Sequence, residues 1–165
     1  MNGGRDRDET GSAVPGADRH DGGPGGQVRG LAHIALATAD ADALAITLAA
    51  ALGATRGAEE LLDGGALRLV FMHLGSVTLE LLEPRSADHT VAKFLAARGP
   101  GLHHVSFEVG DLEQSLGAAR VAGVQLIDET PREGAHGTSV AFLHPKSLGG
   151  VLIELCQSAS PPRRD

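Results

Sequence analysis

An internal repeat is the feature that most restricts how this chain can fold. The stretch "HIALATAD", which begins at His33, matches "HVSFEVGD", which begins at His104, at an offset of 71 residues (104 minus 33). Further along, "LEL" around Glu80 matches "IEL" around Glu154 at an offset of 74 residues (154 minus 80). A repeat of this length indicates that two similar units, stacked or paired, build the structure.

Each unit is expected to contain one strand, one helix and three more strands. In the first unit, the strand-like stretch "LAHIALAT" is followed by Asp40 at a helix N-cap position, and the apolar helical stripe that follows ends at Gly53. Short strands separated by turn sequences are then expected at residues 54–62, 66–74 and 77–84. The second unit repeats this order, with a strand at 101–109, a cap at Asp111, a helix at 112–123 and strands near 124–129, 138–145 and 150–156.

These elements predict an α+β fold in which two paired βαβββ modules form a curved mixed sheet around a cleft. The predicted domain covers residues 30–157, divided into module one (30–84), a linker helix (88–99) and module two (101–157). Residues 1–29 contain no Leu, Ile or Phe and are rich in Gly, Asp and Arg, so we expect them to form a disordered tail. Residues 158–165 are expected to form a second, short tail.

Composition excludes several classes of partner. The chain has 165 residues and a formal net charge of -7, and no run of Lys or Arg alternates with aromatic residues. We therefore expect neither nucleic acid nor a membrane surface as a partner. The single cysteine, Cys156, cannot form an intrachain disulfide, and no apolar segment resembles an export signal, so the expected location is cytoplasmic.

Strand alternation selects one of the two adjacent histidines in "GLHHVSFEV". On a regular strand, His104 shares a face with Ser106, whereas His103 shares a face with the apolar Val105 and Phe107. Only one of the two histidines is therefore expected to face inward, and the pattern favours His104.

The same alternation places a second histidine and two glutamates on that inner face. His33 lies opposite Ile34 on its strand, and Glu80 and Glu154 each have bulky apolar neighbours that point the other way. Two imidazoles and two carboxylates form a ligand set suited to cobalt, manganese or nickel, with room for two more ligands. The alternative for each residue alone is an ordinary polar side chain on a solvated sheet face.

The paired units resemble the vicinal oxygen chelate superfamily. Within it, the stretches "LELLEPRSADHTVAKFL", "GPGLHHVSFEV" and "FLHPKSLGGVLIEL" resemble the methylmalonyl-CoA epimerase family, over about residues 31–157. The resemblance implies that a divalent metal, Co²⁺ in the first place and Mn²⁺ or Ni²⁺ otherwise, is bound by His33, Glu80, His104 and Glu154. It also implies an isomerase that interconverts (R)- and (S)-methylmalonyl-CoA by abstracting the C2 proton through a metal-stabilised enolate.

The acid and base needed for this reaction are only partly identified. The resemblance makes Glu154 the candidate catalytic base. Some members of the family carry a second acid/base glutamate on the third strand of the first unit, but this chain has Arg68 or Leu69 there, depending on the alignment. The second group could be Asp63, Glu60, a metal-bound water or no group at all.

Two loops are candidates for substrate contact. Lys146 in "HPKS" could pair with a phosphate of the acyl-CoA, although an exposed loop lysine is commonly just solvated. In "EGAHG", the backbone N–H groups around Gly134, His136 and Gly137 could approach the substrate carboxylate, although two glycines also suit an ordinary hairpin.

Two other functions use the same fold. One is a glyoxalase-type lyase or isomerase with the same metal set and another oxygen-chelating substrate, and the other is a metal-free module that sequesters a ligand. The intact ligand set argues against the second. Because exposed sheet edges are usually paired or covered, we also expect a homodimer built from the ordered region.

Overall fold

The computed structural model describes residues 28–159. Residues 1–27 and 160–165, which make up most of the two predicted tails, lie outside the described residues. The expectation that these tails are disordered therefore concerns residues outside the described range. The first described strand begins at Val28, two residues before the predicted start of the domain at residue 30.

The first module has the predicted element order. Asp40 caps the first helix by accepting a hydrogen bond from the Ala43 N–H, and Gly53 ends it in the left-handed conformation, with φ 69°. The elements are β1 (Val28–Ala37), α1 (Ala41–Leu52), β2 (Thr55–Leu62), a 3₁₀ turn η1 (Asp63–Gly65), β3 (Leu67–Leu74) and β4 (Val77–Pro84). The linker helix α2 (Thr90–Arg98) follows.

The second module differs from the prediction at one strand. Its elements are β5 (Gly101–Val109), α3 (Leu112–Val121), β6 (Arg132–Glu133), η2 (Ala135–Gly137), β7 (Ser139–Leu143), η3 (Pro145–Ser147) and β8 (Ile153–Gln157). The strand predicted near 124–129 is wrong, because this segment makes only an isolated bridge between Leu126 and Leu143. The edge strand is instead the two-residue β6, which pairs with β7.

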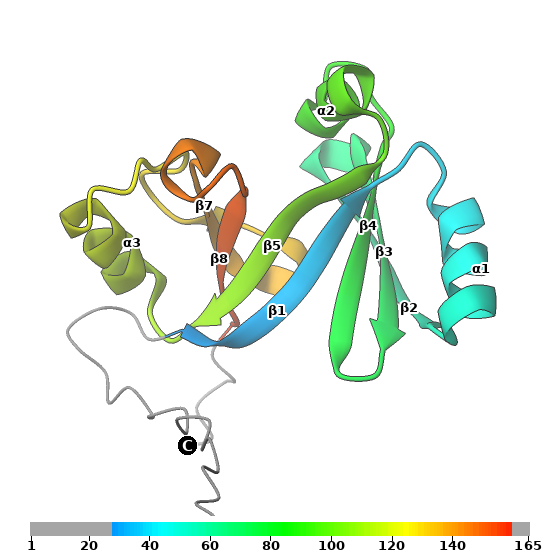
Figure 1. Ribbon diagram of the computed structural model, residues 1–165, viewed down its shortest axis with the longest axis horizontal. Helices are drawn as coiled ribbons and strands as arrows, with labels where there is room; N and C mark the ends of the chain where they lie inside the picture. The colour runs from blue at the N-terminus through cyan, green and yellow to red at the C-terminus, as the bar shows by residue number, and fades with distance from the viewer. Residues whose placement is uncertain (1–27, 160–165) are drawn as a thin grey trace, which may run out of the picture.

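All eight strands form one mixed sheet whose order mirrors the repeat. The order is β2-β3-β4-β1-β5-β8-β7-β6, so β1 and β5 are the central pair and the flanking strands correspond one to one. The two central strands are antiparallel to each other, and each is parallel to the last strand of its own module. Figure 1 shows the sheet curling so that its two halves face each other. The predicted pair of βαβββ modules is confirmed.

Helices cover the outer face of each half of the sheet. In the first half, α1 packs on a buried cluster that includes Val70, Met72 and Leu81, and α3 packs on an equivalent cluster in the second half. A third cluster, which includes Leu69 and Phe71, lies on the opposite face of the first half and is partly covered by α2. Because α1 and α3 pack on the outer face and α2 covers only part of the inner, concave face, the rest of the concave face is available for a site. Within residues 28–159, no helix is long and apolar enough to cross a membrane.

Candidate active site

The four predicted ligands come from the four central strands. His33 lies on β1, His104 on β5, Glu80 on β4 and Glu154 on β8. The sheet register brings these strands together, since Ala35 of β1 is the partner of both Glu80 and His104. Each module contributes one imidazole and one carboxylate, as the repeat predicts.

The ligand atoms meet around the His33 ring. Its Nε2 lies 3.1 Å from the Nε2 of His104 and 3.4 Å from one carboxylate oxygen of each glutamate, Glu80 and Glu154. Atoms of His33, His104 and Glu154 all lie within 4.8 Å of one another, a spacing at which they could hold one metal ion. Ser106 donates a hydrogen bond of 2.7 Å to Glu154 Oε1 and so fixes the orientation of that carboxylate.

Burial changes the protonation of this group. Desolvation raises the pKa of Glu80 to about 8, with a further contribution from the charge of Glu154. Desolvation also raises the pKa of Glu154 to about 7, although the Ser106 hydrogen bond opposes it. It lowers the pKa of His33 to about 4 and that of His104 to about 2. The imidazoles are therefore neutral at pH 7, with nitrogen lone pairs available to a cation.

This donor set fits a divalent transition metal. Atoms of His33, His104 and Glu154 lie close enough to share one ion, and the Glu80 carboxylate lies beside them, 3.4 Å from His33 Nε2. A cation would favour the ionised form of the two buried carboxyl groups. The structure brings all four predicted residues together, and metal binding by them stays a prediction.

The expectation that only one histidine of the pair 103–104 faces inward is wrong. The β1–β5 register slips here, because Ala35 pairs with His104 whereas the next residue, Leu36, pairs with Leu102. His103 is thus the extra residue of a β-bulge, which re-aims a side chain. Its ring packs edge-on against Phe94 of α2 at 4.9 Å and lines the same cavity as His104.

A cavity of about 660 Å³ opens over the ligand group. One wall is apolar and includes Leu69, Phe71 and Leu82 from the first module. The opposite wall is formed by the second module and includes Glu154 and Phe142. An apolar cavity with a few convergent polar groups is the usual form of a small-molecule site.

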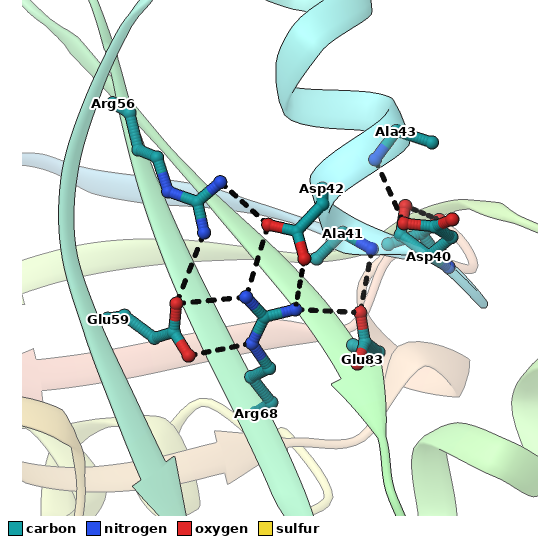
Figure 2. A network of polar contacts seen from close by, with 9 residues as sticks. Asp40, Ala41, Asp42, Ala43, Arg56, Glu59, Arg68 and Glu83 are labelled. Carbon is teal, nitrogen blue, oxygen red and sulfur yellow. Dashed lines mark hydrogen bonds and ion pairs between the residues drawn. The ribbon is translucent and has the colours of Figure 1, made fainter.

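The structure separates the two residues that the alignment left open on the third strand. Arg68 lies on the outer face, where it donates hydrogen bonds to Glu59 (2.8 Å), Asp42 (2.9 Å) and Glu83 (3.2 Å), as Figure 2 shows. The Glu83 carboxylate also accepts a bond of 2.8 Å from the Ala41 N–H at the start of α1. Arg68 therefore joins strands to a helix end and takes no part in the cavity.

Leu69 points the other way, is 1% exposed and lines the cavity. An aliphatic side chain consequently occupies the wall where some family members carry a second glutamate. This chain has no proton-transfer group at that position.

Two of the alternatives for the second group are close to the cavity, and each is paired with a histidine. Asp63 lies 2.9 Å from His89 Nε2, and Glu60 lies 3.2 Å from His136 Nδ1. Sequence reasoning missed His89, whose one signal is its position just before the linker helix, where its ring nitrogen accepts from the Val91 N–H as an N-cap.

The predicted substrate-contact residues are not all brought to the cavity. Gly134 and His136 line it, whereas Lys146 and Gly137 are not among the described residues that do. The backbone N–H of Gly134 bonds to Thr138, and that of His136 bonds to Glu60, so neither is free for a substrate carboxylate. Contact of these residues with substrate stays a prediction.

Comparison with known proteins decides the family. The model of the Glyoxalase/Bleomycin resistance protein/Dioxygenase superfamily matches residues 32–142. The mitochondrial methylmalonyl-CoA epimerase of Bos taurus is 34% identical over 148 residues, which is 89% of this chain and 82% of that protein. The chain belongs to the methylmalonyl-CoA epimerase family. Family membership confirms the resemblance drawn from the sequence and the prediction of an epimerase-class isomerase.

Solved structures of methylmalonyl-CoA epimerases have the same fold. The enzyme from Mycobacterium tuberculosis gives a TM-score of 0.76 at 35% identity, covering 81% of this chain and 90% of that one. A single-residue variant of the Streptomyces coelicolor enzyme, solved in complex with 2-nitronate-propionyl-CoA, gives a TM-score of 0.75 at 33% identity, covering 81% of this chain and 100% of that one.

Proposed function

We propose that this chain interconverts (R)- and (S)-methylmalonyl-CoA in a metal-dependent reaction that removes and returns the C2 proton. The observation that carries this proposal is the convergence of His33, His104, Glu80 and Glu154 at a cavity of about 660 Å³. The family adds support, because a related epimerase was solved with an acyl-CoA bound.

A divalent metal held by these four residues, with Co²⁺ proposed first and Mn²⁺ or Ni²⁺ as alternatives, would supply Lewis-acid stabilisation of the negative charge that develops when a proton leaves carbon. The residues of the chain do the rest. The apolar wall excludes water around the reacting carbon, which strengthens electrostatic interactions there.

Glu154 is the proposed base for one face of the substrate. Its side chain points from β8 into the cavity, and the Ser106 hydrogen bond to Oε1 holds the carboxylate in one orientation. A fixed carboxylate beside the reacting carbon can remove its proton without first reorganising.

The test follows the proton. The metal-loaded protein, given methylmalonyl-CoA in D₂O, should replace the C2 hydrogen with deuterium and interconvert the epimers, as followed by NMR and chiral analysis. Glu154→Gln should abolish both, because it removes the base and one ligand, whereas Glu113→Gln on the surface of α3 should change neither. Absence of exchange from either epimer, in protein shown to hold its metal, would leave a lyase or another isomerase in its place.

A further inference from the structure

Inversion at C2 requires a proton on the face opposite to the base, and the cavity wall at Leu69 cannot provide one. With Glu154 on one side only, the proton removed would return to the same face. A second group must therefore reach the cavity from the first-module side, carry a transferable proton and exchange it with solvent.

The Asp63–His89 pair does not meet these needs. The Nδ1 of His89 accepts a hydrogen bond of 3.2 Å from the Val91 N–H, and its Nε2 lies 2.9 Å from Asp63. Both ring nitrogens are thus occupied, and the ring holds the start of α2 in place. Moving a proton through it would disrupt the helix cap.

The Glu60–His136 pair is arranged differently. Glu60 Oε2 accepts a bond of 2.9 Å from the His136 backbone N–H and lies 3.2 Å from its Nδ1. The carboxylate thereby favours a proton on Nδ1 and leaves Nε2 as the reactive atom. Among residues 28–159, Nε2 has no hydrogen-bond partner, and the side chain is 53% exposed, so it can exchange protons with solvent.

The backbone around His136 is fixed in an uncommon conformation. His136 has φ 54° and ψ 29°, a left-handed conformation that is uncommon for residues other than glycine. Such conformations persist only where surrounding contacts enforce them, and they concentrate at functional sites. Here the enforcing contacts include the Glu60 bond and the ring of Phe71, whose centroid lies 4.5 Å from that of His136.

The fold places His136 across the cavity from Glu154. Its loop belongs to the second module but crosses to the first, where it contacts Glu60 on β2 and Phe71 on β3. Glu154 lies on β8, on the other side of the central β1–β5 pair. The sheet curls so that its two halves face each other (Figure 1), and both His136 and Glu154 line the cavity between them.

We infer that His136, positioned by Glu60, is the second catalytic acid and base, acting on the face of C2 opposite Glu154; this inference rests on the proposed function. The Glu154 carboxylate takes the C2 proton, and the electron pair of that C–H bond passes into the thioester. Protonated His136 then gives its Nε2 proton to the other face of C2, where the electron pair forms the new bond. Solvent returns a proton to His136 and removes one from Glu154, and the other epimer uses the two groups in reverse.

The decisive experiment treats the two epimers separately. In metal-loaded His136→Gln, inversion should fall about 100-fold or more, the range expected for loss of one acid/base group. One epimer should still exchange its C2 hydrogen in D₂O, because Glu154 remains, while the other should lose exchange as well. His73→Gln, at an exposed position near the end of β3, is the matched control and should behave as the native chain.

Glu60 is tested as a positioning residue. Glu60→Gln should lower kcat for inversion with little change in KM, and should have no further effect when His136→Gln is already present. Inversion at the native rate in His136→Gln, or equal loss of exchange from both epimers in folded, metal-loaded variant, would overturn the inference. If the native chain exchanges neither epimer, the proposed function itself fails, which is a distinguishable result.

Discussion

Without the proposed metal, the stability of this protein should fall as the pH rises above neutrality. In the metal-free chain, burial raises the pKa of Glu80 to about 8 and that of Glu154 to about 7. Both groups have ordinary values in the unfolded chain, near 4.5. A carboxyl group whose pKa is raised on folding stabilises the folded state while both states are protonated, and this advantage is lost as the pH rises through the folded-state pKa.

The histidines shape the acidic side of the profile. Burial lowers the pKa of His33 to about 4 and that of His104 to about 2, so the unfolded chain binds more protons at these residues below about pH 6.5. Between about pH 4.5 and 6.5, the extra protons on the folded glutamates and on the unfolded histidines nearly cancel. Burial also lowers the pKa of His103, which adds protons on the unfolded side, so the free energy of unfolding should stay nearly constant or rise slightly in this interval.

Above pH 6.5 only the glutamates matter. From pH 6.5 upward, folded Glu80 stays protonated for about 1.5 pH units, up to its pKa of about 8, and folded Glu154 for about 0.5 units, up to its pKa of about 7. At 1.36 kcal/mol per unit, the free energy of unfolding should fall by about 2.7 kcal/mol by pH 8.5. Urea unfolding of chelator-treated protein at pH 6.5 and 8.5 measures this difference. A saturating divalent metal should abolish the fall, because the cation favours the ionised carboxylates.

Variants separate this effect from a general sensitivity to alkaline pH. Glu80→Gln should reduce the fall to below about 1 kcal/mol, since only the contribution of Glu154 remains. The surface variant Glu113→Gln should leave it unchanged. A metal-free protein whose free energy of unfolding stays constant or rises between pH 6.5 and 8.5 would refute the reasoning about buried, uncompensated carboxyl groups.

Three further predictions concern the ligands, the assembly and one loop. His104→Ala should lose both metal and activity, whereas His103→Ala should retain metal and mainly alter packing against α2. Metal analysis of the purified variants distinguishes them. Loss of metal from His103→Ala but not from His104→Ala would contradict the ligand assignment. Light scattering should show a homodimer whether or not residues 1–27 are present, and a truncated chain that ran as a monomer beside a dimeric full chain would be evidence against it. Gly134→Ala should lower Tm and slow inversion, because its added Cβ would lie 2.7 Å from side-chain atoms of Thr138 and Val140; unchanged calorimetry and kinetics would show that the loop can relax.

The repeat allowed most of the fold, and the four side chains that lie together in the cavity, to be predicted. Matching His33 to His104 and Glu80 to Glu154 required only the period of two along a strand, and the sheet register brought these residues together. Alternation failed at His103, because one extra residue in β5 creates a bulge that no local pattern in "GLHHVSFEV" reveals.

The remaining features depend on contacts between distant segments. The pairing of Glu60 with His136 joins residues 76 apart in the chain, and nothing in either local sequence indicates it. The same is true of Arg68, whose outward direction follows from the β3 register and from partners on β2, β4 and α1. The failed strand near 124–129 had a suitable apolar pattern, but β7 takes its pairing partner from residues 132–133 instead.

The symmetric order of the strands has a consequence for how such a site could originate. Each module carries one imidazole and one carboxylate. A single module that paired with a copy of itself would therefore already bring together two imidazoles and two carboxylates. This pattern is what duplication and fusion of an ancestral single module would leave. The turns after β2 and β6 hold equivalent places, and each contains a non-glycine residue with positive φ, Asp63 and His136. In one copy this turn anchors a helix through Asp63, and in the other it presents an imidazole to the cavity. Fusion into one chain permits this divergence, because the two copies no longer share a sequence and can act differently on the two faces of a chiral carbon.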